Sequence, residues 1–210
     1  MSLNSEHNKH RIINATFALS LKHGFDNVSI KQIQEESGLA SGSIYYHFKD
    51  KDEILDYMIK TYMTNSFYSY RDDIKNFEGT FIEKLKFILE YVISGFATKS
   101  EPESLYIPIR EQFDHKEYFT LVKSIYHHHP KVRSAYHKLN EKLFGLYYEV
   151  FQEAIENKQI REDIDIKTLV IFFQTILKGY TDMWTYQPNI SIEEIIDANI
   201  KMIDEAIKKS

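Results

Sequence analysis

The segment GSIYYHF, from Gly42 to Phe48, gathers side chains that can donate hydrogen bonds and also stack. Tyrosine hydroxyls and a histidine ring can bond to phosphate oxygens or base edges, and their rings can lie on a sugar or a methyl group. Helical residues advance by about 100° each, so Ile44 and Phe48 share one side, which we expect to be buried. The other side carries Gly42, Ser43, Tyr46 and His47, with Ser41 and Tyr45 at the boundary.

Two further helices are predicted just before this segment. The first runs from about residue 5 to 23 and ends at Gly24, a residue suited to a left-handed cap. The second begins at Ser29, where Gln32 three residues later predicts a capping box, and ends at Gly38. This order indicates a helix-turn-helix, whose last helix fits the major groove of DNA. The alternative is that the tyrosine-rich helix packs beneath the rest of the protein.

Composition limits the class of protein. The 210 residues include 43% hydrophobic and 27% charged residues, which is typical of a folded chain. The absence of cysteine excludes disulfides and thiolate chemistry, while seven glycines and four prolines favour helix packed on helix. The polar N-terminus and the lack of a long apolar run predict no signal peptide and no membrane helix, so we expect a cytoplasmic protein.

The region from Arg11 to Leu55 resembles the N-terminal signature of the TetR/AcrR family of transcriptional regulators. The matching stretches are RIINA, HGF, SIKQI, SGLASGSIYYHF and KDEIL. The resemblance implies an all-α fold, with a three-helix helix-turn-helix DNA-binding domain at residues 1–50. A larger helical ligand-binding and dimerisation domain would follow at residues 51–210. It also implies a homodimeric repressor that binds a palindromic double-stranded DNA operator and is released by a small molecule.

Position by position, the resemblance also implies which residues contact DNA. Lys31 would contact the DNA, and Ser43 and Tyr45 would reach phosphates. The residues that would face base edges or the adjoining sugars are Ser41, Gly42, Tyr46 and His47. Lys51, in the first turn of a helix that Asp50 caps, would hold a further phosphate together with the exposed amides of that turn. The sequence departs from the family pattern at Gln34 and Ala40, which bears on the operator sequence.

Aromatic side chains in the middle helices could build a ligand site. Ring walls with a few hydroxyls, and Arg110 beside a helix break at Pro108, suit a mostly apolar or weakly anionic small molecule. The predicted ligand-binding residues are Tyr62, Phe67, Tyr91, Tyr106, Arg110, Phe113, Tyr147, Phe173 and Tyr180. The alternative is that these rings are ordinary core.

Of the last two predicted helices, the one from Asp165 to Trp184 is apolar on two faces, which one core cannot cover, and the final helix carries a stripe of isoleucines. We therefore expect them to meet their symmetry mates in an isologous four-helix bundle. The predicted dimer-interface residues are Leu169, Phe172, Ile176, Met183, Ile192, Ile196, Ile200 and Ile203. The alternative is an internal bundle without a partner.

Residues 127 to 129 are three consecutive histidines, with His115 and His137 nearby. Consecutive helical residues point about 100° apart and cannot all meet one ion, so we predict no metal site and no cofactor. The chain lacks a nucleophile elbow, a phosphate-binding glycine loop and paired metal-ligand spacing, so we predict no enzyme activity. The alternatives are a regulator that answers to a protein partner, with no small-molecule ligand, and, least favoured, an enzyme that uses the aromatic cavity.

Overall fold

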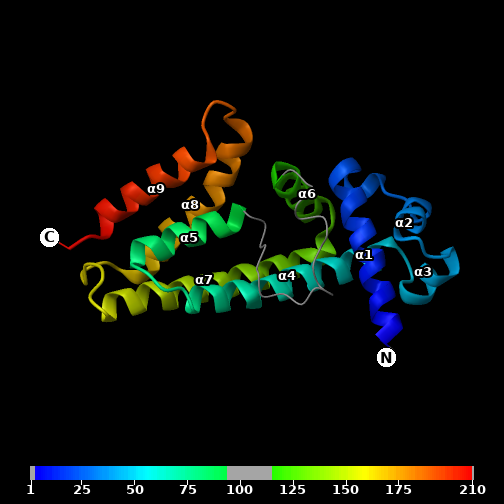
Figure 1. Cartoon of the computed structure of the whole chain (residues 1–210), viewed down its shortest axis with the longest axis horizontal. Helices are drawn as coiled ribbons and strands as arrows, with labels where there is room; N and C mark the ends of the chain where they lie inside the picture. The colour runs from blue at the N-terminus through cyan, green and yellow to red at the C-terminus, as the bar shows by residue number, and fades with distance from the viewer. Residues whose placement is uncertain (1–2, 94–114, 210) are drawn as a thin grey trace. The chain divides into compact units, whose positions relative to one another are not determined.

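The computed structural model describes residues 3–93 and 115–209, and within these ranges the chain is helical without any strand (Figure 1). The all-α prediction is therefore confirmed. The helices are α1 (Leu3–His23), α2 (Ile30–Ser37), α3 (Ser41–His47), α4 (Lys51–Lys75), α5 (Phe81–Ile93), α6 (His115–His128), α7 (Arg133–Glu156), α8 (Ile166–Tyr186) and α9 (Ile192–Ile207). Two 3-10 turns, η1 (Phe25–Asn27) and η2 (Pro130–Val132), precede α2 and α7.

Local signals explain where α2 begins and ends. The Ser29 hydroxyl accepts a hydrogen bond from the Gln32 amide at 3.2 Å, and the Gln32 side chain accepts one from the Ser29 amide at 2.9 Å. This reciprocal pair is the predicted capping box. Gly38 ends the helix with φ 64°, a left-handed conformation that glycine adopts without strain. Arg11 Nη2 donates to the carbonyl of the last helical residue, Ser37, at 2.6 Å.

Contacts divide the chain into two compact units. The first contains α1 to α3, α4 as far as Phe67, and α6 with η2 and the start of α7, up to His137. Its core is a set of fully or nearly fully buried apolar side chains from all of these elements, among them Ile12, Ile33, Ile44, Phe48, Leu55, Met58, Ile125 and Val132. This division does not coincide with the predicted boundary after residue 50. That boundary separates a DNA-binding domain from a ligand-binding and dimerisation domain, and it stays a prediction.

The second unit contains the rest of α4 and α7 with α5, α8 and α9, and it has an aromatic core. The hydroxyls of Tyr70 and Tyr147 lie 2.8 Å apart, and Tyr180 donates to the Leu89 carbonyl at 2.7 Å. The Phe173 ring meets Tyr147 edge-on, with ring centroids 5.4 Å apart. Burial raises the pKa of Tyr70, Tyr147 and Tyr180, so these phenols stay neutral and act as hydrogen-bonding groups.

None of the described helices combines the length and the apolar character that crossing a membrane requires.

Candidate nucleic-acid interface

The short helix α3 has one buried and one exposed side. Ile44 is fully buried and Phe48 nearly so, as their spacing predicted. Tyr46 is 81% exposed and Tyr45 is 58% exposed. The Tyr46 ring meets the ring of His47 edge-on, with centroids 5.0 Å apart. The alternative in which these two tyrosines pack beneath the protein is therefore wrong, because both phenols face outward.

The remaining predicted DNA contacts on α2 and α3 also lie at the surface. Ser41 and Gly42 are exposed, Ser43 and His47 are partly exposed, and no other atom within 4 Å would meet a Cβ at Gly42. The side chain of Lys31 is 84% exposed, and its ammonium approaches Glu35 only at 4.0 Å. An ion pair this long and this exposed contributes little, so the Lys31 ammonium is available to an anion. Contact of these residues with DNA stays a prediction.

Lys51 has a different setting from the other predicted contacts. Its ammonium donates to the carbonyls of Phe25, Asp26 and Val28 at 3.0, 3.0 and 2.9 Å. It also lies 4.7 Å from the centroid of the Phe25 ring. An ammonium has three donors, and all three are engaged here. The structure therefore gives Lys51 the role of anchoring the turn between α1 and α2 to the start of α4. The predicted contact with a phosphate is not tested by this geometry.

Replacing Lys51 with methionine should separate these two roles. Loss of three charge-assisted bonds to partly buried carbonyls should lower the free energy of unfolding by about 1–3 kcal/mol. If Lys51 anchors the turn and does not also contact a phosphate, the slope of log affinity against log salt should not change. Thermal unfolding and anisotropy titrations over a salt series measure the two effects.

Lys31→Met is the matched control for that substitution. It should flatten the salt slope by about one per protomer and leave the melting temperature unchanged. A flatter salt slope for Lys51→Met without a loss of stability would instead support the predicted contact between Lys51 and a phosphate.

The predicted ligand-binding residues do not gather at one site. Tyr62 belongs to the first unit, where its hydroxyl donates to Asn14 at 2.7 Å, and Phe67 is buried at the end of that unit. The second unit buries Tyr91, Tyr147, Phe173 and Tyr180 in its aromatic core. Tyr106, Arg110 and Phe113 lie outside the described residues, as does the predicted break at Pro108. Ligand contact by any of these residues stays a prediction.

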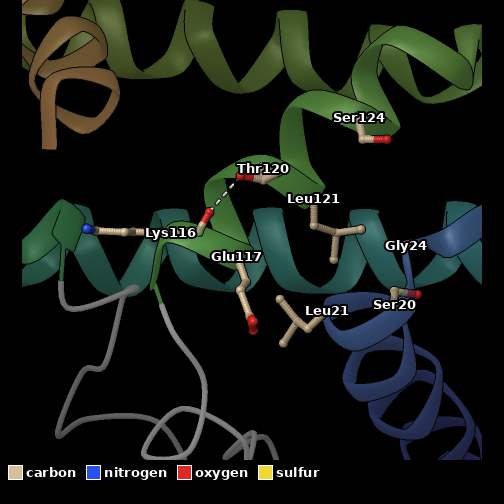
Figure 2. A pocket seen from close by; sticks show the side chains of 8 residues that line it. All are labelled: Ser20, Leu21, Gly24, Lys116, Glu117, Thr120, Leu121 and Ser124. Atoms are coloured by element: carbon tan, nitrogen blue, oxygen red, sulfur yellow. Dashed lines mark hydrogen bonds between the residues drawn. The ribbon is translucent and has the colours of Figure 1, made fainter. Parts of the chain in front are cut away.

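A pocket of about 300 Å³ lies in the first unit, between the end of α1 and α6 (Figure 2). It is lined by Ser20, Leu21, Gly24, Lys116, Glu117, Thr120, Leu121 and Ser124. Figure 2 shows the α1 side chains facing those of α6, with the Thr120 hydroxyl turned back onto the carbonyl of Lys116 at 2.9 Å. None of the predicted ligand-binding residues lines this pocket.

The predicted dimer-interface residues divide into a buried and an exposed group. Leu169, Ile196 and Ile203 are at most 5% exposed within their own chain, so they offer little surface to a partner, and their place at an interface stays a prediction. Helix α9 uses its isoleucine stripe to pack against α5 and α8. Phe172 and Met183 on α8 are 45% and 46% exposed, and Ile176, Ile192 and Ile200 are partly exposed.

Five of the exposed residues of α8 form a continuous face. Phe172, Thr175, Gly179, Met183 and Tyr186 follow one another at spacings of three or four residues, which places them on one side of a helix. The opposite side of α8 carries the buried residues Val170, Phe173, Leu177 and Tyr180. We call the five exposed residues the outer face of α8. Helix α8 thus has apolar residues on a buried and on an exposed side, but the division differs from the predicted one, since Val170 and Leu177 are buried together with Leu169 and Phe173.

The histidines at the end of α6 make contacts that sequence reasoning missed. His129 Nε2 lies 2.9 Å from Asp26 Oδ1, and His128 Nδ1 lies 3.4 Å from Asp26 Oδ2. His137 bonds to the hydroxyl of Tyr126 at 3.1 Å. Among the described residues, no group of three or more metal-ligating side chains is placed to hold an ion. Asp26 is more than 100 positions from its partners, and no local pattern marks such a pair.

Comparison with known proteins assigns the class. A family model described as bacterial regulatory proteins of the tetR family matches residues 12–58, which include η1, α2 and α3. The HTH-type transcriptional regulator SAR2658 of Staphylococcus aureus (strain MRSA252) is 25% identical over 196 residues, covering 92% of this chain and 90% of that protein.

Solved structures share the fold. A transcriptional regulator of Saccharomonospora viridis, in complex with choline, is 19% identical with a TM-score of 0.75 and covers 96% of this chain and 98% of its own. The regulator FadR of Bacillus subtilis, in complex with stearoyl-CoA, is 18% identical with a TM-score of 0.64 and covers 92% of this chain and 96% of its own.

The helix-turn-helix, its outward-facing donors and these relatives define a helical transcriptional regulator rather than an enzyme. Its residues 12–58 match the N-terminal domain of the tetR family of bacterial regulatory proteins, and the chain is similar to HTH-type transcriptional regulators over most of its length.

Proposed function

We propose that the protein is a homodimeric repressor that grips a palindromic operator through α3 and is released by a small molecule. The observation that carries the DNA-binding part is the arrangement of α3, where Ile44 and Phe48 are buried while Tyr45 and Tyr46 face outward. A helix held by its apolar side presents the other side to a groove. Hydroxyl and imidazole donors on that side suit phosphate oxygens and base edges.

Dimerisation supplies the second copy of α3 that contacts the operator. The outer face of α8 offers large apolar side chains at Phe172, Met183 and Tyr186, separated by the small residues Thr175 and Gly179. Small residues allow two helices to approach closely, and a two-fold axis lets one face meet its own copy. Two copies of α3 would then enter successive major grooves about 34–36 Å apart.

The effector is proposed to be a mostly apolar small molecule. The structures of two fold neighbours hold choline and stearoyl-CoA, so this fold accommodates both a small cation and a long acyl chain. Helix α4 supplies residues to both units, from Lys51 at the DNA-binding end to Tyr70 in the aromatic core. A ligand that prefers one setting of α4 would shift the population by its differential affinity, typically about 1–3 kcal/mol of coupling.

The proposal is tested by recovering duplexes from a random DNA library and titrating the protein onto them by fluorescence anisotropy. We expect sequence-specific binding at least about 1,000-fold tighter than binding to unselected duplex at the same salt. Adding cell extract during the selection should deplete the recovered pool if an effector releases the operator. Binding no tighter than to unselected duplex would overturn the proposal.

Tyr46→Ala should weaken operator binding by about 1–3 kcal/mol, or roughly 5- to 150-fold, because Tyr46 is the more exposed of the two tyrosines on α3. The loss should be concentrated at one base step, which a panel of singly substituted duplexes measures. Tyr148→Ala removes another exposed tyrosine, on α7, and should leave affinity unchanged. Equal losses of operator affinity from both variants would show that Tyr46 does not contact the bases.

A further inference from the structure

Arg11 of α1 contacts the turn that connects α2 to α3. Its Nη2 donates a hydrogen bond to the carbonyl of Ser37, the last residue of α2, at 2.6 Å. The bond spans 26 positions of the sequence and is partly buried. Because a guanidinium is always charged, this short bond belongs to the strong, charge-assisted class. Arg11 therefore fixes the end of α2 to α1.

The end of α2 is a favourable place for a cation. The last four carbonyls of an α-helix lack partners within the helix, and the helix dipole places negative charge there. Gly38 follows with φ 64°, and a Cβ built on it would lie 3.0 Å from Arg11 Nη2. The guanidinium thus lies directly against the backbone of the turn, where glycine suits both the left-handed conformation and the close approach. We call Arg11, Ser37 and Gly38 the turn anchor.

The start of α3 depends on this turn for its position. Helix α3 has seven residues, and a helix this short does not hold its place without tertiary contacts. Its N-cap residue is Ala40, whose methyl side chain cannot cap the helix. The buried residues Ile44 and Phe48 lie at the middle of α3 and just beyond its end. The N-terminal half is therefore held by the preceding turn, through the half-buried Leu39 and the turn anchor.

We propose that Arg11 is a positioning residue for DNA recognition, which fixes α3 in the orientation that its exposed side chains need to reach base edges. This inference rests on the proposed function of α3. Base contacts carry the specificity and require a closely placed helix, whereas the attraction to phosphates is independent of sequence. Loss of the turn anchor therefore lowers the affinity for the operator more than the affinity for unselected duplex.

Hydrogen exchange tests the turn anchor without DNA. Arg11→Met keeps an unbranched stem but removes the charge and the donors. The backbone amides of residues 37–43 should then exchange about tenfold faster than in the wild-type protein, since one charge-assisted bond corresponds to about a tenfold change in an opening equilibrium. The amides of residues 13–20 in α1 should exchange as before. No acceleration, or an equal acceleration of both segments, would overturn the proposal.

Anisotropy titrations measure the consequence for recognition, as the ratio of Kd for unselected duplex to Kd for selected duplex at one salt concentration. Arg11→Met should lower this ratio about tenfold at a temperature where the variant remains folded. Arg11→Lys keeps the charge and a donor for the Ser37 carbonyl, so it should recover most of the ratio. A purely stabilising role for Arg11 would lower the melting temperature and leave the ratio of the folded protein unchanged.

Lys22→Met is the matched control, because it removes an exposed cation from the last turn of the same helix. It should leave both the Kd ratio and the exchange of residues 37–43 unchanged. A ratio that Arg11→Met does not lower, or that Arg11→Lys does not recover, would refute the positioning role. If the wild-type protein selects no duplex, the proposed function fails, and the exchange experiment still decides whether Arg11 holds the turn.

Discussion

Met183→Lys is expected to make the protein monomeric at micromolar concentration and to weaken operator binding on the order of 100-fold or more. Met183 lies on the outer face of α8 and is 46% exposed in the single chain. A two-fold interface would bury both lysines of a dimer, at a cost of several kcal/mol per unpaired charge. A monomer contacts one half-site, so its affinity falls toward the non-specific range. Light scattering coupled to gel filtration and anisotropy titration measure the two effects.

Tyr148→Lys provides the control for the lysine substitution. Tyr148 is an exposed aromatic residue on α7, outside the outer face of α8. A lysine there adds the same charge and should leave both mass and affinity unchanged. A Met183→Lys protein that remains dimeric with full operator affinity would place the interface elsewhere.

Phe173→Ala is expected to lower the free energy of unfolding by about 3–5 kcal/mol, which is the usual cost of removing a buried phenylalanine ring. Phe173 is 1% exposed and meets both Tyr147 and Phe151 edge-on, with ring centroids 5.4 Å apart in each pair. For a chain of this length, the melting temperature should fall by roughly 10 °C. Differential scanning calorimetry measures the loss.

Ile171→Ala serves as the matched control for Phe173→Ala. Ile171 lies on the same helix and is 51% exposed, so its truncation should cost less than about 0.5 kcal/mol. A Phe173→Ala protein as stable as this control would mean that the aromatic core rearranges to fill the space. Such a core would be adaptable enough to admit a ligand, which a rigidly packed one is not.

Local patterns predicted α2 and α3 well, because the signals for these helices are short in range. The Ser29–Gln32 capping box, the cap at Gly38 and the burial of Ile44 opposite Tyr46 all follow from spacings of three or four residues. Each is settled within one helical turn, so tertiary packing had little to override. The family resemblance added the register of the whole region.

Side-chain partners across the fold could not be predicted from spacing. Lys51 has the sequence context of a phosphate contact, yet its three donors bind a turn more than 20 residues earlier. The isoleucine stripe of α9 is amphipathic whether it meets a partner chain or its own core, and only the folded chain shows that Ile196 and Ile203 are internal. Asp26 gives no local sign of its contact with His129.

Hydroxyl-radical footprinting on a selected duplex tests the central claim most directly, since it reports where the protein covers the DNA backbone. Two copies of α3 in successive major grooves predict two protected windows on one face of the duplex, centred about one helical turn apart. Tyr46→Ala should weaken both windows equally, since each copy of the chain contributes one. A single protected window, or protection that continues around the whole duplex, would contradict a dimer reading DNA through α3.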